Sequence, residues 1–312
     1  MMTVAFVFPG QGSQSLGMLA ELAAAQPTVQ STFAEASEAL GYDLWQLVQE
    51  GPEEELNNTT KTQPALLASS VATWRVWNEL SQIQPVMMAG HSLGEYSALV
   101  CSGVLNFTDA IQLVADRGDY MQDAVPTGIG SMAAVLGLED GQIEAVCEQA
   151  AQGQIVSAAN YNSSGQVVIA GHKEAVERAI ELAKTAGAKR SVILPVSVPS
   201  HCALMQKAAD QFAGRLNTVN FEQATIPVLH NVDATECSDI SEIKVALQDQ
   251  LCQPVRWVET IQKMVSKDVS TIVECGPGKV LSGLIKRIDR SLNIFPVFDP
   301  ASLEKALAEV TN

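Results

Sequence analysis

The run Gly90-His91-Ser92-Leu93-Gly94 places a serine between two glycines. Residues 86–89 before it are apolar and predict a strand, and residues 95–101 after it predict a helix. A serine presented at a sharp strand-to-helix turn needs glycine two residues before it and two residues after it, because larger side chains would collide there. The first helical turn also directs backbone N–H groups towards any oxyanion formed at that point. The pattern predicts a nucleophilic Ser92, although it also fits a turn that merely starts a helix.

A nucleophilic serine needs a base, and the chain offers His91, His172, His201 and His230. His91 faces away from the serine across the predicted turn, and His172 precedes a predicted helix, so we interpret both as supporting or surface residues. His201 lies in a loop that two prolines restrict and that can reach the strand ends. We predict His201 as the base, since imidazole is the usual partner of such a serine. The alternative is an ordinary loop histidine.

The group that would orient His201 is not evident in the sequence. Asp140 is the only aspartate between Asp123 and His201, and the glutamates of that stretch fall on predicted helices. The order serine, acid, histidine of the α/β hydrolases is therefore not met. A later carboxylate, Asp233 or Asp239, or a main-chain carbonyl could serve instead.

Two further residues could bind charge near the serine. Arg117 follows Val114 by three residues and precedes Met121 by four, so it lies towards the apolar side of its predicted helix. A guanidinium in that position binds either an anionic ligand or a carboxylate of the chain itself, and the spacing does not separate the two. Gln11 lies in the glycine turn after the first predicted strand, where its amide or backbone N–H could face Ser92, or serve only the turn.

Other cofactor chemistry finds little support in the sequence. Six cysteines are scattered without a Cys-x-x-Cys pair or a nearby histidine cluster, so we expect reduced thiols and no metal site. The segment Gly276-Pro277-Gly278-Lys279 lacks the first glycine of a phosphate-binding loop, because Val273 stands at that position.

The overall composition is that of a globular protein with an acidic surface. Of the 312 residues 47% are hydrophobic, and the net charge is −16. This charge argues against nucleic acid and anionic membranes as partners, and no apolar run is long enough to span a membrane. We expect a cytoplasmic protein, or one of the plastid stroma if a transit segment was removed. The cations cluster in the second half, at Lys189-Arg190, Lys279, Lys286-Arg287 and Arg290, where a local basic surface could form.

The pattern of elements predicts an α/β fold with an insertion. Strands at residues 3–9, 86–89, 227–231 and 271–274 alternate with helices, one introduced by Gln63-Pro64 and one capped by Thr108, which indicates a mostly parallel sheet. Residues 131–196 follow the order strand, helix, strand, strand, helix, strand of a ferredoxin-like unit. We therefore predict a large α/β hydrolase-like subdomain of residues 1–126 and 198–312 and a small ferredoxin-like subdomain of residues 127–197.

Several motifs in this order resemble one enzyme family. They are Phe8-Pro9-Gly10-Gln11-Gly12, Thr62-Gln63-Pro64-Ala65, Gly90 to Glu95, Arg117-Gly118, Val198-Pro199-Ser200-His201 and Glu274 to Gly278. Together they resemble the malonyl-CoA:acyl carrier protein transacylases of type II fatty acid synthesis, over the full length of the chain.

The resemblance implies transfer of a malonyl group from malonyl-CoA to the phosphopantetheine thiol of an acidic acyl carrier protein, with no bound cofactor. It implies that Ser92 is acylated, that His201 is its base and that Arg117 binds the malonyl carboxylate. It further suggests an oxyanion hole from the N–H groups of Gln11 and Leu93, and a main-chain carbonyl, that of Gln250, behind the histidine. The remaining expected pocket or supporting residues are Gln63, His91, Met121, Asn160 and Ser200.

Three other functions stay open on the sequence alone. A serine hydrolase would release free malonate, but the missing acid counts against it. A carrier-binding module without activity would never carry an acyl group on Ser92. A transferase for another acyl donor would not depend on Arg117 for its selectivity.

Overall fold

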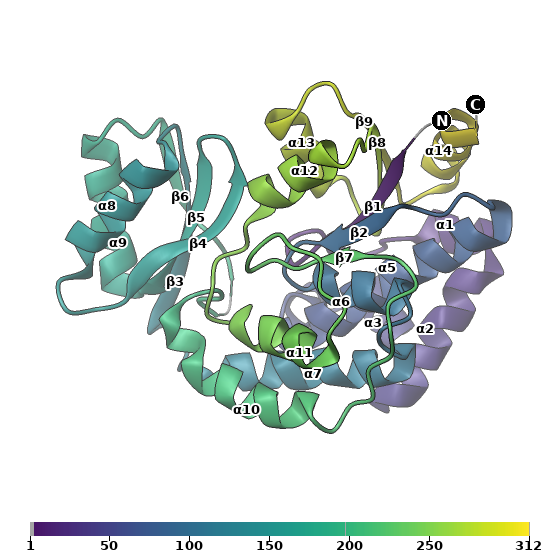
Figure 1. The fold of residues 1–312 in the computed structure, drawn as a ribbon. Coiled ribbons are helices and arrows are strands. Elements are labelled where there is room, and N and C mark those ends of the chain that lie inside the picture. The colour runs from purple at the N-terminus through teal and green to yellow at the C-terminus, as the bar shows by residue number, and fades with distance from the viewer. Residues whose placement is uncertain (1–2, 197, 312) are drawn as a thin grey trace.

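The computed structural model describes residues 3–196 and 198–311, and it contains two separate sheets with their helices (Figure 1). The predicted subdomain limits at residues 1, 197 and 312 lie outside the described residues. None of the helices in the described part of the chain is long and apolar enough to cross a membrane.

The larger part of the chain is built on a parallel sheet. Its strands are β1 (Val4–Phe8), β2 (Met87–Gly90), β7 (Val228–Leu229), β8 (Thr271–Cys275) and β9 (Asn293–Val297). They pair in the order β7-β2-β1-β8-β9, all parallel. Phe6 and Phe8 of β1 pack into one apolar cluster and Ala5 and Val7 into another, because neighbouring side chains of a strand point to opposite faces. Both faces are thus covered, as is usual for a parallel sheet.

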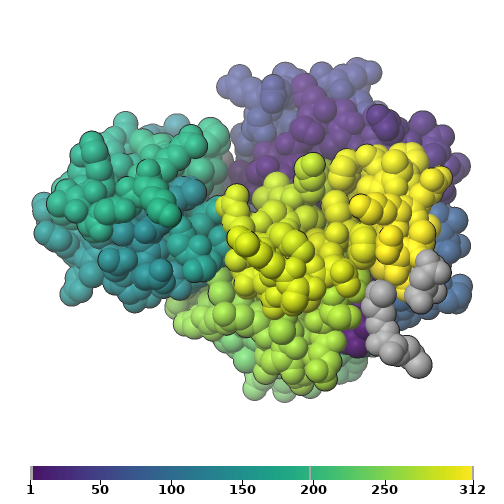
Figure 2. Space-filling view, turned by 90° about the horizontal axis from the view of Figure 1, so that it is seen from above, coloured from purple at the N-terminus to yellow at the C-terminus, as the bar shows by residue number. Residues whose placement is uncertain are grey.

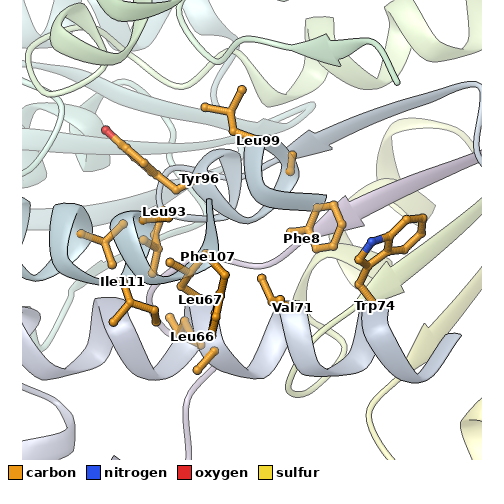
Figure 3. Packing of buried hydrophobic residues seen from close by; sticks show 14 of the residues in the cluster. Phe8, Leu66, Leu67, Val71, Trp74, Leu93, Tyr96, Leu99, Phe107 and Ile111 are labelled. Atoms are coloured by element: carbon orange, nitrogen blue, oxygen red, sulfur yellow. The ribbon is translucent and has the colours of Figure 1, made fainter. Parts of the chain in front are cut away.

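Helices lie on both sides of this sheet, some packed directly on it and others packed on those helices. They are α1 (Ala20–Ala25), α2 (Pro27–Leu40), α3 (Leu44–Glu50), α4 (Glu53–Leu56), α5 (Thr59–Leu80), α6 (Gly94–Cys101), α7 (Phe107–Ala124), α10 (Gln206–Leu216), α11 (Ile240–Asp249), α12 (Trp257–Ser266), α13 (Val280–Ile288) and α14 (Pro300–Thr311). Figure 3 shows Leu67, Val71 and Trp74 of α5 on the side of the helix that faces Phe8. Trp257 of α12 and Leu281 of α13 belong to the cluster on the opposite face.

Two predicted helix starts are wrong by a few residues. Helix α5 begins at Thr59 rather than at Gln63-Pro64, because the Asn58 side chain accepts a hydrogen bond from the Thr60 N–H and caps the helix there. Pro64 therefore lies inside the helix. In α7 the cap is Asn106 and not Thr108, since the Asn106 side chain accepts the Thr108 N–H.

The inserted segment forms the antiparallel sheet. Its elements are β3 (Gly130–Leu136), α8 (Asp140–Ala151), β4 (Val156–Ser163), β5 (Gln166–His172), α9 (Lys173–Thr185) and β6 (Arg190–Ile193). The strands pair in the order β4-β5-β3-β6, which is the arrangement of a ferredoxin-like fold. This confirms the predicted fold class, and Figure 2 shows the segment as a lobe beside the rest of the molecule. The division into two subdomains at residues 127 and 197 stays a prediction.

The topology brings the loops after β1 and β2 together. The two strands are neighbours, and the His91 N–H donates to the Phe8 carbonyl directly beyond them. In open α/β sheets ligands bind at the carboxyl ends of the strands. This edge of the sheet is therefore the expected place for the site.

Candidate active site

The turn that carries Ser92 has the strained geometry of a nucleophile elbow. Ser92 has a φ of 51°, a backbone value that residues other than glycine rarely adopt. A Cβ atom on Gly90 would overlap the backbone of Gly94, and one on Gly94 would overlap the Phe8 carbonyl. The two glycines therefore allow β2, β1 and α6 to approach closely around the serine.

Ser92 and His201 lie within hydrogen-bond distance. The Ser92 Oγ is 2.8 Å from His201 Nε2, and His201 Nδ1 is 2.6 Å from the main-chain carbonyl oxygen of Gln250. Because a carbonyl only accepts, Nδ1 carries the ring proton and Nε2 is free to take the serine proton. The sequence left open whether a carboxylate or a main-chain carbonyl orients His201, and in the structure the main-chain carbonyl of Gln250 does so. Asp233 and Asp239 instead cap a turn and helix α11.

The surroundings of His201 favour its neutral form. Burial and then the positive charge of Arg117 lower the pKa of His201 to about 3, and the hydrogen bond to Gln250 only partly opposes them. A neutral imidazole accepts a proton from serine without first losing one. The histidine is therefore ready to act as a base at neutral pH.

This lowered pKa predicts a pH profile without an acid limb near the ordinary histidine value of 6.5. We expect the rate at which phenylmethylsulfonyl fluoride modifies Ser92 to stay constant as the pH falls through 6.5. An acid limb centred on 6.5 in the native protein would contradict the assignment. Between 6.5 and about 3 the unfolded chain binds a proton here that the folded chain does not, so stability falls as the pH is lowered. The rates should therefore be measured only where circular dichroism shows a folded protein.

Arg117 is buried but has no carboxylate partner. Its side chain is 2% exposed, and no Asp or Glu among the described residues forms an ion pair with it. Its Nη1 donates to Gln63 Oε1 at 2.6 Å and its Nη2 to Gln250 Oε1 at 3.0 Å, while its Nε has no partner. Both acceptors are neutral amides, so the positive charge is held in place but not neutralised. An internal carboxylate partner is thus absent among the described residues, and the binding of an anionic ligand by Arg117 stays a prediction.

A cavity of about 450 Å³ opens onto Ser92 and His201 between the two sheets. Six of the predicted site residues line it: Gln11, His91, Ser92, Asn160, Ser200 and His201. The residues Arg117, Gln63, Met121, Leu93 and Gln250 are not among those that line the cavity; all five are buried. Gln250 connects the two groups, because its Nε2 donates to the Ser92 carbonyl while its Oε1 accepts from Arg117.

The N–H groups expected to form the oxyanion hole are available. The backbone N–H groups of Gln11 and Leu93 have no hydrogen-bond acceptor among the described residues. The Gln11 side chain is held by the Thr59 hydroxyl at 3.3 Å, and Thr59 in turn accepts from Gln63 at 3.0 Å. The loop after β1 is thereby tied to the helix that supplies Gln63.

Several polar residues of this site are not predicted by the sequence patterns. Asn231, which follows β7, accepts the Ser92 N–H at 2.7 Å and donates to the Gly90 carbonyl at 2.7 Å. Asn162 of β4 pairs with His91 Nε2 at 2.7 Å, which gives that histidine a supporting role. Glu95 and His230 form a buried pair nearby. Glu95 could have been found from its spacing, since it follows Ser92 by three residues on the predicted helix.

No group of three or more metal-ligating side chains that could hold an ion exists within residues 3–196 and 198–311. The four histidines are instead engaged separately, and His172 accepts the Ile155 N–H at the start of α9. The arrangement of Ser92, His201 and Arg117 is suited to the transfer of an acyl group that carries a negative charge.

Comparison with known proteins agrees with this chemistry. Residues 5–297 match the family model described as an acyl transferase domain. A protein of Salmonella typhimurium named malonyl CoA-acyl carrier protein transacylase is 58% identical over 98% of this chain and 99% of its own length. A protein of the same name from Bacillus subtilis is 45% identical over 98% of this chain and 97% of its own length. Both relatives are bacterial, so the plastid alternative receives no support.

Solved structures agree as well. The malonyl CoA-acyl carrier protein transacylase of Coxiella burnetii has a TM-score of 0.98 at 52% identity, covering 100% of this chain and 98% of that one. A malonyl-transacylase in complex with a type II PKS acyl-carrier protein has a TM-score of 0.97 at 57% identity, covering 98% and 99%. This chain therefore belongs to the acyl transferase family, and within it to the malonyl CoA-acyl carrier protein transacylases.

Proposed function

We propose that this chain transfers a malonyl group from malonyl-CoA to the phosphopantetheine thiol of an acyl carrier protein, for fatty acid synthesis, through an ester on Ser92. The observation that carries the proposal is the 2.8 Å contact between Ser92 and His201, with the uncompensated charge of Arg117 held beside it by Gln250. The family membership supplies the donor and the acceptor.

The first half-reaction loads the serine. Ser92 Oγ attacks the thioester carbonyl and passes its proton to His201 Nε2, while the N–H groups of Gln11 and Leu93 bind the oxyanion. The carbon–sulfur bond then breaks, and His201 gives the proton to the departing thiolate of coenzyme A. Throughout, Arg117 binds the free carboxylate of the malonyl group.

The second half-reaction runs the same steps in reverse. The thiol of the carrier's phosphopantetheine gives its proton to His201, and its sulfur attacks the ester carbonyl. The bond to Ser92 Oγ breaks and the serine recovers its proton from the histidine. A water molecule could attack the same ester, so transfer requires that the loaded cavity keep water away from the ester carbonyl.

Intact-mass measurement tests this proposal directly. After incubation with malonyl-CoA, the protein should carry one malonyl group on Ser92, and it should lose that group on addition of carrier protein with its phosphopantetheine. Release of free malonate faster than loading of the carrier would identify a hydrolase instead. A carrier-binding protein without activity would show no mass increase.

The basic residues of the second half form a candidate docking surface for the acidic carrier. Lys189, Arg190, Lys286 and Arg287 are all exposed. Arg287 donates to Gln166 at the start of β5, and the stem of Lys189 lies beside Gly137, whose N–H bonds the Gly165 carbonyl in the same hairpin. Both basic pairs therefore include a residue close to the β4–β5 turn.

Charge reversal at this surface should weaken the carrier reaction only. For Lys286→Glu with Arg287→Glu we expect the KM for the carrier protein to rise about tenfold, with less effect at high salt. The rate of loading from malonyl-CoA should not change. Lys305→Glu is the matched control, because Lys305 is exposed on α14, at the opposite side of the molecule from the small lobe (Figure 1). An equal rise in KM for the carrier protein in both variants would show that this surface is not the docking site.

A further inference from the structure

Glu95 is a fully buried carboxylate on the first turn of α6, three residues after Ser92. A buried carboxylate is costly unless it is hydrogen-bonded. Glu95 Oε1 is 2.7 Å from His230 Nδ1, and Oε2 accepts from the Asn231 N–H at 3.1 Å and from Gln250 Nε2 at 2.7 Å. One side chain thus holds three groups from two distant segments of the chain.

Two of these three groups touch the reacting residues directly. The carbonyl of Gln250 fixes the proton on His201 Nδ1, and its side chain also donates to the Ser92 carbonyl at 3.1 Å. Asn231 bonds the Ser92 N–H with its side chain and so holds the strained elbow. Glu95 is the acceptor that these two residues share.

The third group, His230, balances the charge of Glu95. Burial lowers the pKa of His230, but the hydrogen bond and the negative charge of Glu95 together raise it above the ordinary histidine value. His230 and Glu95 are 1% and 0% exposed, so this pair has no access to solvent, and His230 Nε2 has no hydrogen-bond partner among the described residues. His230 bonds to Oε1 of Glu95, which leaves Oε2 to accept from both Asn231 and Gln250.

A role in the helix alone does not explain this arrangement. A carboxylate on the first turn of a helix commonly bonds the free N–H groups of that turn. The three partners of Glu95 belong to the segments around β7 and after α11, and none belongs to α6.

We propose that Glu95 is a positioning residue that sets Gln250 and Asn231, and through them holds His201 and Ser92 at the reacting distance. This inference rests on the proposed function and deepens it. In this role Glu95 aligns the base and the nucleophile and does not contact the substrate.

Glu274 provides a matched control. It too is a fully buried carboxylate with three hydrogen bonds, but it accepts from the Leu281 N–H and from the N–H and hydroxyl of Ser282, at the start of α13. The change to glutamine keeps the size of the side chain in both cases. In Glu95→Gln the new NH₂ group cannot accept, so at least one of the three donors must lose its bond or change its tautomer.

For Glu95→Gln we expect kcat for malonyl loading to fall about tenfold while KM for malonyl-CoA stays within about threefold, because misalignment affects the reacting atoms more than binding. Glu95→Leu should lower kcat about 100-fold. Glu274→Gln should keep the native kcat, whatever it does to the melting temperature. The proposal fails if Glu95→Gln and Glu274→Gln have the same kcat, or if the loss lies in KM alone.

A second readout does not depend on the proposed function. Phenylmethylsulfonyl fluoride reacts with an activated serine in the absence of malonyl-CoA and carrier protein, and its rate should fall by the same factor as kcat in Glu95→Gln. A native rate of sulfonylation would overturn the positioning role. A slow rate would support that role even if malonyl loading itself were not observed, so the two proposals can fail separately.

Discussion

Replacement of Ser92 by alanine is expected to lower the rate of malonyl transfer to the carrier protein by about 10⁴-fold or more, because no other group can form the ester. The native Ser92 Oγ lies 2.8 Å from His201 Nε2, and alanine removes only that oxygen. The elbow should remain folded, since the Cβ atom and the bonds of the backbone are unchanged. Intact-mass analysis of the variant should show no malonyl adduct.

The matched control is Ser97→Ala, on the helix α6 that follows the elbow. Ser97 is fully buried and its hydroxyl has no hydrogen-bond partner among the described residues. We expect this variant to load and transfer malonyl at the native rate. An adduct of native yield on Ser92→Ala would show that another nucleophile carries the acyl group, and the proposed mechanism would then be wrong.

The sequence predicts the elements around the site because they follow simple rules. Buried strands at residues 3–9 and 271–274 and the elbow between a strand and a helix depend on local patterns of apolar residues and glycine. The sequence pattern does not predict strand β9, however. Its segment Asn293–Val297 contains Pro296, which argues against a central strand. The structure places β9 at the edge of the sheet, where one side of the strand needs no partner.

In the candidate site, too, the sequence predicts some of the residues and not others. Ser92 and His201 could be chosen by residue type and by the motifs around them, and the structure brings them together. The groups that hold them could not be chosen in this way. Every residue has a main-chain carbonyl, so nothing in the local sequence marks the one at Gln250. Asn231 can be identified as a site residue only from the pairing of β7 with β2, because this pairing places its side chain beside the elbow.

Replacement of Arg117 by alanine should abolish the preference for malonyl-CoA over acetyl-CoA. We expect kcat/KM for malonyl-CoA to fall about 10³-fold, since the variant loses a charge-assisted and bidentate bond to a carboxylate in a buried place. For acetyl-CoA, which has no such carboxylate, kcat/KM should change only a few-fold. The measurement is the ratio of the two values in one assay, with the melting temperature recorded for each variant. An unchanged ratio would refute the role of Arg117 in binding the substrate carboxylate.

The change Gln63→Glu separates the charge of Arg117 from its shape. Gln63 Oε1 accepts from Arg117 Nη1, and glutamate offers an oxygen in the same place but adds a negative charge. The guanidinium stays in position and becomes the partner of an internal carboxylate, so it attracts the malonyl carboxylate less. Selectivity should therefore shift in the direction of Arg117→Ala although the arginine is intact. If Gln63→Glu kept the native ratio while Arg117→Ala lost it, the arginine would act through its shape and hydrogen bonds rather than its net charge.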